Sequence, residues 1–364
     1  MTVKEVAHIL EELAPLAYAE DFDNVGLLVG DVDLNVTGIL VTLDTLENVI
    51  DEAIEKNCNL IVSFHPIIFN GLKKLTGKNY VERTVLKAIK NDIAIYAIHT
   101  ALDNSISGVN DKICEVLGLS NKHILIPQKK TLKKLVTYVP LANANDLKSA
   151  LFAAGAGNIG NYSDCSFGIE GKGSYKAGKN ANPNKGSIGT LHYENEMQIS
   201  VTFAKAVENK VIKALLEHHP YEEVAYEITT IDNTNKYIGM GMIGELDAPL
   251  SEPEFLDYLK TKMKATVIRH SELRNKDVKK VAVLGGSGAY AINAAKAAGA
   301  DVFVTADVKY HEFYQGEKQL VIADIGHFET EQFTKNLLVD YLTKKIPNFA
   351  IRLSESITNP IKYF

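Results

Sequence analysis

The sequence has 364 residues, 46% of them hydrophobic, and a formal net charge of −6 at pH 7. This length is sufficient for two or three domains with apolar cores of their own. The acidic balance lacks the basic surface that non-specific nucleic-acid binding requires, so no nucleic-acid partner is expected. No apolar run approaches the roughly 18–20 residues of a membrane span, and the N-terminus lacks a signal-peptide pattern.

The cysteine content indicates the compartment. There are three cysteines, Cys58, Cys114 and Cys165, and their odd number and wide spacing fit neither a disulfide framework nor a cysteine-based zinc site. This pattern suits a reducing environment. We therefore expect a cytoplasmic, globular protein of the α/β class.

The first third of the chain alternates predicted helices and strands. Apolar residues at helical spacing predict a first helix over Val3–Leu13. The strands that follow are short and uniformly apolar, which is typical of a parallel sheet buried on both faces. In chain order, the further predicted elements are a strand at Val25–Val29, a strand at Gly38–Leu43, a helix at Leu46–Lys56, a strand at Asn59–Val62, a helix at Tyr80–Lys90 and a strand at Asp92–Ile98.

The order of predicted strands and helices changes after about Ile126. The predicted order becomes strand, helix, strand, strand, helix, strand, which is the ferredoxin-like plan. We therefore predict an inserted α+β domain over residues 128–240, in which Gly171–Gly189 forms a mobile, solvated loop. The predicted elements are a strand at Leu132–Val139, a helix at Ala144–Ala154, a strand at Cys165–Ile169, a strand pair within Gly189–Phe203, a helix at Val207–His218 and a strand at Val224–Ile231.

The α/β pattern resumes in the last third. Ser251 is placed to cap a helix, and a later strand leads into the glycine-rich run Gly285-Gly286-Ser287-Gly288. We predict that residues 1–127 and 241–364 form one discontinuous α/β domain with a mainly parallel sheet. Its predicted C-terminal elements are a helix at Glu252–Lys264, a strand at Val278–Leu284, a helix at Ala291–Ala298 and strands at Asp301–Ala306 and Leu320–Ile325.

Four polar residues follow predicted strands at their C-terminal ends: His65, Asp103, His327 and Glu331. His327 and Glu331 are four residues apart at the start of a helix, so they share one face. Open α/β sheets bind ligands at this end of their strands. A single histidine there more often caps or packs, but two imidazoles with two carboxylates suit zinc, manganese, iron or nickel. We predict a divalent-metal site with one or two ions per subunit.

Three other features have alternative interpretations. His99 precedes Asp103 by four residues, and it either orients that carboxylate, which we favour, or closes a turn. His311 follows another strand and either donates to a substrate or is a surface residue. Both histidines are candidate catalytic residues, with no role assigned. The glycine-rich run could cradle an anion, but a tight turn is favoured over a dinucleotide site.

Six motifs occur in a fixed order: Asp23-Asn24-Val25-Gly26-Leu27, Phe64-His65-Pro66-Ile67-Ile68-Phe69, His99-Thr100-Ala101-Leu102-Asp103-Asn104, Gly285-Gly286-Ser287-Gly288, Thr305-Ala306-Asp307-Val308-Lys309-Tyr310-His311 and Gly326-His327-Phe328-Glu329-Thr330-Glu331. Together they resemble the NGG-interacting-factor-three-like family, whose members are often labelled type 2 GTP cyclohydrolase I homologues. The insert, through its His219-Pro220-Tyr221 motif, resembles the PII/CutA-like domain of the longer bacterial members. The resemblance implies a two-metal site, with His65, Asp103, His327 and Glu331 as ligands, and a ring-shaped homohexamer.

Phe64 departs from the family pattern. The family usually has a His-His-Pro motif, whereas this chain has Phe64-His65-Pro66. A phenylalanine cannot bind a metal, so one imidazole of the expected five-residue set is missing. We hypothesise that one ion is held firmly while the second is weak, absent or completed by water.

Two functions remain open at this point. The first is a metal-dependent hydrolase acting on a small nucleotide-like or heterocyclic substrate, which the family label would make GTP. The second is a non-catalytic metal-binding or regulatory ring assembly, in which the PII-like insert binds an effector or partner. Nothing in the sequence specifies a guanine pocket.

Overall fold

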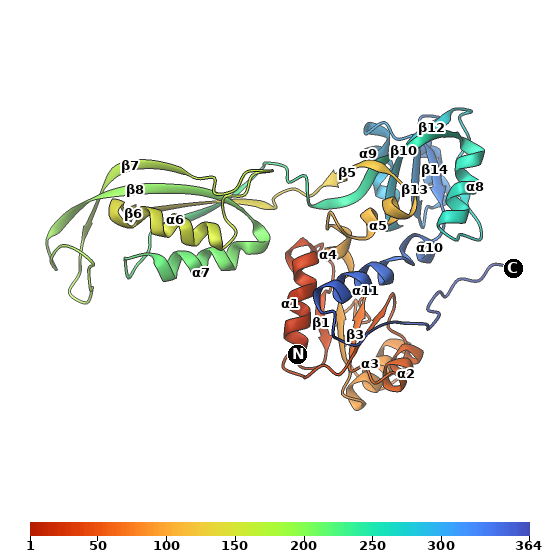
Figure 1. Cartoon of the computed structure of the whole chain (residues 1–364), viewed down its shortest axis with the longest axis horizontal. Helices are drawn as coiled ribbons and strands as arrows, with labels where there is room; N and C mark the ends of the chain where they lie inside the picture. Colours follow the sequence, from red (N-terminus) through yellow and green to blue (C-terminus); the bar gives the residue numbers. More distant parts are fainter. The chain divides into compact units, whose positions relative to one another are not determined.

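The computed structural model describes residues 1–364 and divides the chain into two compact units (Figure 1). One unit contains residues 1–127 and 236–364, and the other contains residues 128–235. The sequence-based boundary at residue 240 falls inside the first unit, because strand β10 (Gly239–Ser251) already pairs with strands of that unit. None of the helices combines the length and the apolar character needed to cross a membrane.

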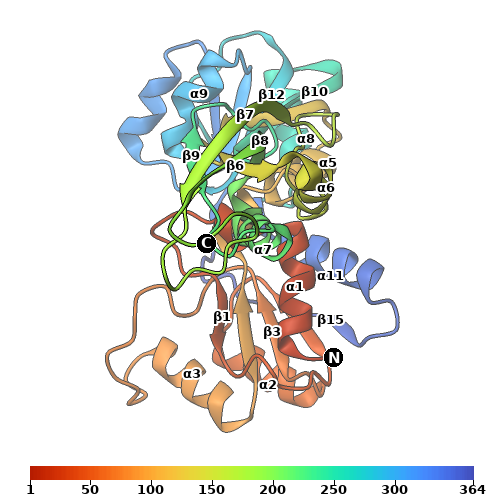
Figure 2. The same cartoon turned by 90° about the vertical axis from the view of Figure 1, so that its left-hand side faces the viewer.

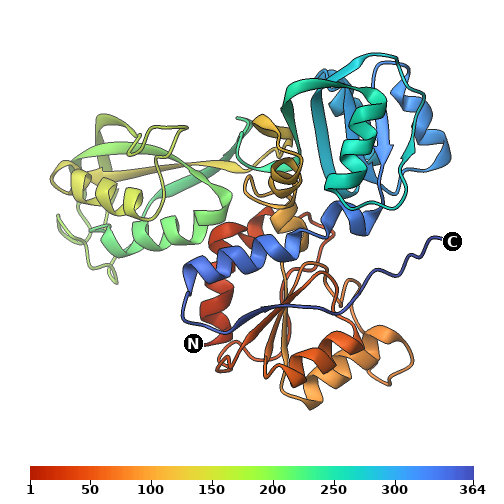
Figure 3. The ribbon, with the colours of Figure 1, turned by 45° about the vertical axis from the view of Figure 1, so that its right-hand side comes forward.

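The first sheet of the larger unit has the strand order β1-β4-β3-β2-β15. Strands β4, β3, β2 and β15 are parallel, and β1 is antiparallel to β4. Helices α1 and α11 cover one face and α2 and α3 the other, so the central strands are buried on both faces (Figure 3). The bounds are β1 (Gly26–Val29), β2 (Ile39–Thr42), β3 (Leu60–Ser63), β4 (Ala94–Ala97), β15 (Ile351–Leu353), α1 (Val3–Leu13), α2 (Glu47–Glu55), α3 (Tyr80–Lys90) and α11 (Thr334–Lys345).

The second sheet of this unit has the order β11-β14-β13-β12-β10-β5. Only β12, β13 and β14 are parallel, and the other three strands pair antiparallel. Where the sequence predicts one mainly parallel sheet, the structure therefore has two sheets, and this one is mixed. The bounds are β5 (Ser120–Pro127), β11 (Arg269–His270), β12 (Asp277–Ser287), β13 (Val302–Ala306), β14 (Val321–Asp324), α8 (Glu252–Lys262), α9 (Ile292–Ala297) and the 3-10 helix η5 (Tyr310–Gly316).

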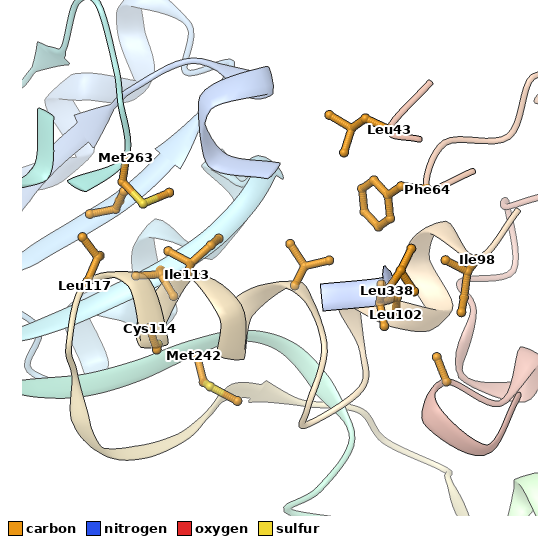
Figure 4. Packing of buried hydrophobic residues seen from close by; sticks show 14 of the residues in the cluster. Leu43, Phe64, Ile98, Leu102, Ile113, Cys114, Leu117, Met242, Met263 and Leu338 are labelled. Atoms are coloured by element: carbon orange, nitrogen blue, oxygen red, sulfur yellow. The ribbon is translucent and has the colours of Figure 1, made fainter. Parts of the chain in front are cut away.

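One hydrophobic core joins the two sheets. Phe64 and Ile98, which follow strands of the first sheet, belong to the same buried cluster as Met242 in the second sheet. Leu102 in helix α4 (His99–Asp103) and Ile113 in helix α5 (Val109–Val116) complete the connection (Figure 4). Because this core is continuous, the C-terminal ends of strands from both sheets are held in one region.

Local sequence signals explain two of the helix starts. Thr2 Oγ1 accepts a hydrogen bond from the Glu5 amide, and the Glu5 carboxylate accepts one from the Thr2 amide, which forms a capping box at α1. Ser251 and Glu254 form the corresponding box at α8. The predicted cap at Ser251 is therefore confirmed.

The inserted unit is a four-stranded antiparallel sheet in the order β7-β8-β6-β9. Helices α6 and α7 pack on one face (Figure 2), and the chain order of strands and helices is the ferredoxin-like one. Strand β7 continues to Lys176, so the segment predicted as a mobile loop from Gly171 is a strand over its first six residues. The bounds are β6 (Leu132–Pro140), α6 (Ala144–Ala153), β7 (Phe167–Lys176), β8 (Leu191–Ala204), α7 (Glu208–His218) and β9 (Tyr226–Ile231).

The C-terminal tail after β15 is held by the carboxylate of Glu52 on helix α2. Glu52 accepts hydrogen bonds from Ser354 Oγ and from the amides of Glu355 and Ser356, and it pairs with Lys56 at 2.8 Å. Burial alone would raise the pKa of Glu52, but these donors outweigh it and lower the pKa to about 2. The first residues of the tail are therefore attached to helix α2 through one ionised side chain.

Replacing Glu52 with Gln should lower the free energy of unfolding by about 1–3 kcal/mol at pH 7, because it weakens charge-assisted hydrogen bonds to a buried acceptor. A carboxylate whose pKa falls on folding stabilises the protein above its ordinary pKa of 4.5, and this contribution is lost as the pH falls toward about 2. Urea unfolding of both proteins between pH 7 and pH 2.5 measures the difference, which should shrink over that interval.

Glu55→Gln is the matched control, since Glu55 is exposed on the same helix. This control should leave the unfolding free energy unchanged. Equal stability of the Glu52→Gln protein and the unaltered protein at pH 7 would contradict the role of Glu52.

Candidate metal centre

His327 and Glu331 are brought together by the turn after strand β14. Gly326 has φ +98°, a conformation that side chains disfavour, and it allows the chain to leave the strand and begin helix α10 (His327–Glu331). One helical turn later, Glu331 Oε2 lies 3.2 Å from His327 Nε2. The predicted shared face is therefore confirmed.

His65 approaches the same carboxylate from the first sheet. It follows strand β3, and its Nε2 lies 3.1 Å from Glu331 Oε2. His65, His327 and Glu331 each offer one ligand atom within 4.8 Å of the others. The structure thus brings together three of the four residues predicted to hold a metal, from elements far apart in the sequence.

A carboxylate orients each imidazole through a hydrogen bond to Nδ1, the ring nitrogen that does not face Glu331. His65 Nδ1 lies 2.8 Å from Asp44 Oδ1, and His327 Nδ1 lies 2.6 Å from Asp307 Oδ2. Donation from Nδ1 leaves the Nε2 lone pair directed toward Glu331, which is the usual arrangement of metal-binding histidines. Sequence analysis missed both carboxylates as partners, although each follows a strand, β2 and β13, as the predicted ligands do.

Two carboxylate oxygens in this region are buried without a hydrogen-bond partner, Oδ1 of Asp103 and Oε2 of Glu331. The two imidazole nitrogens near Glu331 are close enough for ion pairs, but neither contact has hydrogen-bond geometry. Buried polar atoms are otherwise almost always paired. An unpaired carboxylate oxygen beside two imidazole nitrogens is a donor set that a divalent transition metal takes, so His65, His327 and Glu331 fit such an ion.

The electrostatics of the cluster favour a cation. Burial would raise the pKa of Glu331, but His327 and His65 lower it to about 2. Burial would also lower the histidine pKa values, yet the neighbouring carboxylates raise that of His65 to about 10 and that of His327 to about 9. Burial and then the charge of Glu331 raise the pKa of Asp103 well above its ordinary value. A metal ion bound here would compete with protons for the same groups.

A family model described as Duf34/NIF3 (NGG1p interacting factor 3) matches residues 1–360. The chain belongs to this family. It is 38% identical to the GTP cyclohydrolase 1 type 2 homolog of Bacillus subtilis over 370 residues, covering 99% of this chain and 98% of that protein. A Staphylococcus epidermidis protein with the same name is 35% identical over 368 residues, with 100% of both chains covered. The resemblance stated from the sequence motifs is confirmed.

Solved structures of the family share the fold. A Bacillus cereus protein related to NIF3 superposes with a TM-score of 0.86 at 37% identity, covering 100% of this chain and 99% of that one. A Staphylococcus aureus protein superposes with a TM-score of 0.78 at 30% identity and the same coverage. Both similarities span the complete chain, including the inserted unit.

The two candidate catalytic histidines lie in different surroundings. The His99 ring is 5.3 Å from the His65 ring, but its Nδ1 pairs with Asp23 at 2.8 Å. Asp23 accounts only for the Nδ1 side of the ring, so the expectation that His99 orients Asp103 stays a prediction. His311 is exposed in η5, where its ring contacts Tyr310 and Tyr314, and no contact joins it to the cluster.

The backbone of the glycine-rich run lies directly against the metal-binding cluster. Strand β12 extends through Ser287, so Gly285 and Gly286 lie within the strand, while Gly288 makes the predicted turn into the 3-10 helix η4 (Ala289–Ala291). Gly286 has φ +66°, and a Cβ there would lie 2.5 Å from Glu331 Oε1 and 3.3 Å from His327 Cε1. Glycine is needed at this position because the backbone passes directly beneath the cluster.

Phe64 occupies the place next to His65 in the family motif. Its side chain is fully buried, and it packs beside Leu43 and Leu102 (Figure 4). The ring centroid lies 4.8 Å from that of His65 and 5.5 Å from that of His99. An aromatic hydrocarbon ring, which offers no metal ligand, thus lies beside two imidazoles.

Gly286→Ala should weaken metal binding by about tenfold or more, because a new methyl group displaces the Glu331 carboxylate. Competition with a chromogenic chelator measures the affinity for Zn²⁺ or Mn²⁺. Gly299→Ala is the control, since Gly299 also has positive φ (+72°) but open space around it. Equal affinity of the Gly286→Ala and Gly299→Ala proteins would refute the contact.

The unaltered chain should hold one tightly bound ion, since three donors converge, Asp103 offers one further unpaired oxygen and Phe64 supplies none. Metal analysis of protein purified without added metal gives the number directly. Phe64→Leu should leave that number unchanged, whereas Phe64→His should raise it toward two. Two tightly held equivalents in the unaltered protein would exclude a single-ion site.

Proposed function

We propose that this protein is a divalent-metal-dependent hydrolase of small nucleotide-like or heterocyclic substrates. The observation that carries this proposal is the convergence of two imidazole nitrogens on a buried, unpaired Glu331 oxygen, with a second unpaired carboxylate oxygen on Asp103. His65, His327, Glu331 and Asp103 would hold the ion, which can be zinc, manganese, iron or nickel. Such an ion, when bound, acidifies a water molecule and polarises a carbonyl or phosphoryl group.

The chain supplies the remaining groups that hydrolysis needs. Asp44 and Asp307 accept hydrogen bonds from Nδ1 of the two ligand histidines and so fix the direction of each Nε2. Asp23 holds His99 in the same way, with the ring of His99 beside that of His65. We assign His99 the role of moving a proton at Nε2 during hydrolysis.

A cavity of about 740 Å³ opens beside His65 and supports a heterocyclic substrate. Its wall includes the rings of Phe69 and Tyr80 and the side-chain amide of Asn70, and no lysine or arginine lines it. Apolar walls with amide groups suit a planar base, whereas a triphosphate receives no basic side chain here. We therefore propose recognition through the ring, even though the relatives are named for a GTP reaction.

A second candidate function follows from the number of donors. Four protein ligands complete a tetrahedral ion and leave no open position for water or substrate, as in structural sites. In that case the protein would be a non-catalytic metal-binding ring, a homohexamer whose PII/CutA-like insert binds an effector or partner. An activity screen of the metal-loaded protein separates the two functions.

Asp103→Ala should abolish hydrolysis in protein loaded with Mn²⁺, Zn²⁺, Fe²⁺ or Ni²⁺, because it removes the buried, unpaired carboxyl oxygen that we propose as a ligand. The assay screens nucleosides, nucleotides, phosphoesters and cyclic amides for product release. His311→Ala should retain activity within about twofold, since His311 lies outside the cluster. Tight metal binding without turnover of any compound would favour the non-catalytic assembly.

A further inference from the structure

A second cavity lies wholly within the inserted unit. Its volume is about 670 Å³, within the range of small-molecule sites. Strands β7 and β8, the loop 177–190 and the segment 220–225 enclose it. No part of the metal centre contributes to it.

Strand register places this cavity on the sheet face opposite the helices. Leu135 and Ile199 belong to the core under α6 and α7. Side chains alternate along a strand, so Tyr138 on β6 and Glu196 and Gln198 on β8 point to the other face. That face carries no helix (Figures 1 and 2). The cavity is therefore separate from the hydrophobic core of the unit.

Hydrogen bonds fold the loop 177–190 over this face. Tyr175 Oη donates to the Lys185 carbonyl at 2.7 Å, and the Asn182 amide donates to Glu222 Oε1 at 2.8 Å. Asn184 Nδ2 donates to the Pro220 carbonyl at 3.1 Å. The loop predicted to be mobile is thus attached at several points, and the cavity has a defined wall.

Aromatic rings and a carboxylate form one side of the cavity. The rings of Tyr175 and Tyr221 meet edge to face with centroids 5.9 Å apart, and Tyr221 Oη donates to Glu196 Oε1 at 2.7 Å. Gly173 leaves room for this carboxylate, since a Cβ there would lie 2.0 Å from Glu196 Oε2. Burial and Glu196 raise the pKa of Tyr221, so its hydroxyl remains a neutral donor.

The charged side chains that face the cavity are acidic. Glu196, Glu222 and Glu223 line it. Lys172 and Lys176 also border it, but they alternate with Tyr175 on strand β7 and so point to the opposite face. Positively charged groups are attracted both to carboxylates and to the faces of tyrosine rings. Anionic ligands would meet repulsion from the same carboxylates.

We propose that this cavity binds a small organic cation that carries an amine or a quaternary ammonium group. The tyrosine rings contact its alkyl groups, and Glu196 neutralises its charge. A bare metal ion would leave the aromatic wall without a role, and an anionic nucleotide would face the carboxylates. The inserted unit is thereby a ligand-binding module with a chemistry distinct from that of the metal centre.

Calorimetric titration of the full-length protein with choline, spermidine and 3,3-dimethylbutan-1-ol tests this proposal. The alcohol is a neutral analogue of choline with nearly the same shape. At least one cation should bind, with an affinity about tenfold or more above that of the alcohol. The proposal would be overturned if neither cation bound at millimolar concentration, or if choline and the alcohol bound equally. It would also be overturned if ATP, titrated in the same way, bound more tightly than the cations.

Two pairs of variants assign the binding to the cavity. Glu196→Gln keeps an acceptor for Tyr221 but removes the charge, so it should weaken cation binding by about tenfold. Glu170→Gln is its control and should leave cation binding unchanged, because Glu170 is exposed on the opposite face of β7. Tyr175→Phe should retain binding and Tyr175→Leu should lose it, since the ring faces the ligand. Equal affinities within either pair contradict the assignment, and thermal unfolding verifies that each variant is folded.

Discussion

The interior carboxylate of Glu331 is the group on which the architecture of the larger unit depends. A buried charge is costly unless other groups compensate it, and this chain compensates it from both sheets. His65 arrives from the end of β3 and His327 from the end of β14. The hydrophobic core that runs from one sheet to the other holds these ends together. A unit with two independently packed sheets could not maintain contacts near 3 Å at their junction.

The C-terminal tail is linked to the same centre. Thr358 Oγ1 donates to Asp44 Oδ2 at 2.8 Å, while Asp44 Oδ1 faces His65 Nδ1 at 2.8 Å. Glu52 fixes the preceding residues of the tail, so the position of Thr358 depends on that carboxylate. The last segment of the chain thus helps to orient a ligand histidine, although it contributes no ligand of its own. This explains why a tail without helix or strand is anchored by carboxylates.

The sequence alone predicted the strand–helix alternation and the group of polar residues at strand ends, because both depend on local patterns. It could not show that the strands form two sheets, since an apolar strand does not specify its neighbours. The partner of His99 was missed because Asp23 lies in a loop distant in sequence. The polar second half of β7 lacks hydrophobic alternation, and it is a strand because it pairs with β8 from Gly171 through Lys176.

Charge balance bears on the number of ions that we propose for the centre. Two buried carboxylates, Glu331 and Asp103, have unpaired oxygens, and one divalent ion with neutral imidazoles would neutralise both. The other nearby carboxylates are engaged, since Asp44 and Asp307 hold the two ligand histidines. A second divalent ion would therefore add buried positive charge without a free acidic partner, and Phe64 offers it no donor. The buried charges therefore support the proposal of a single ion, whichever reaction it serves.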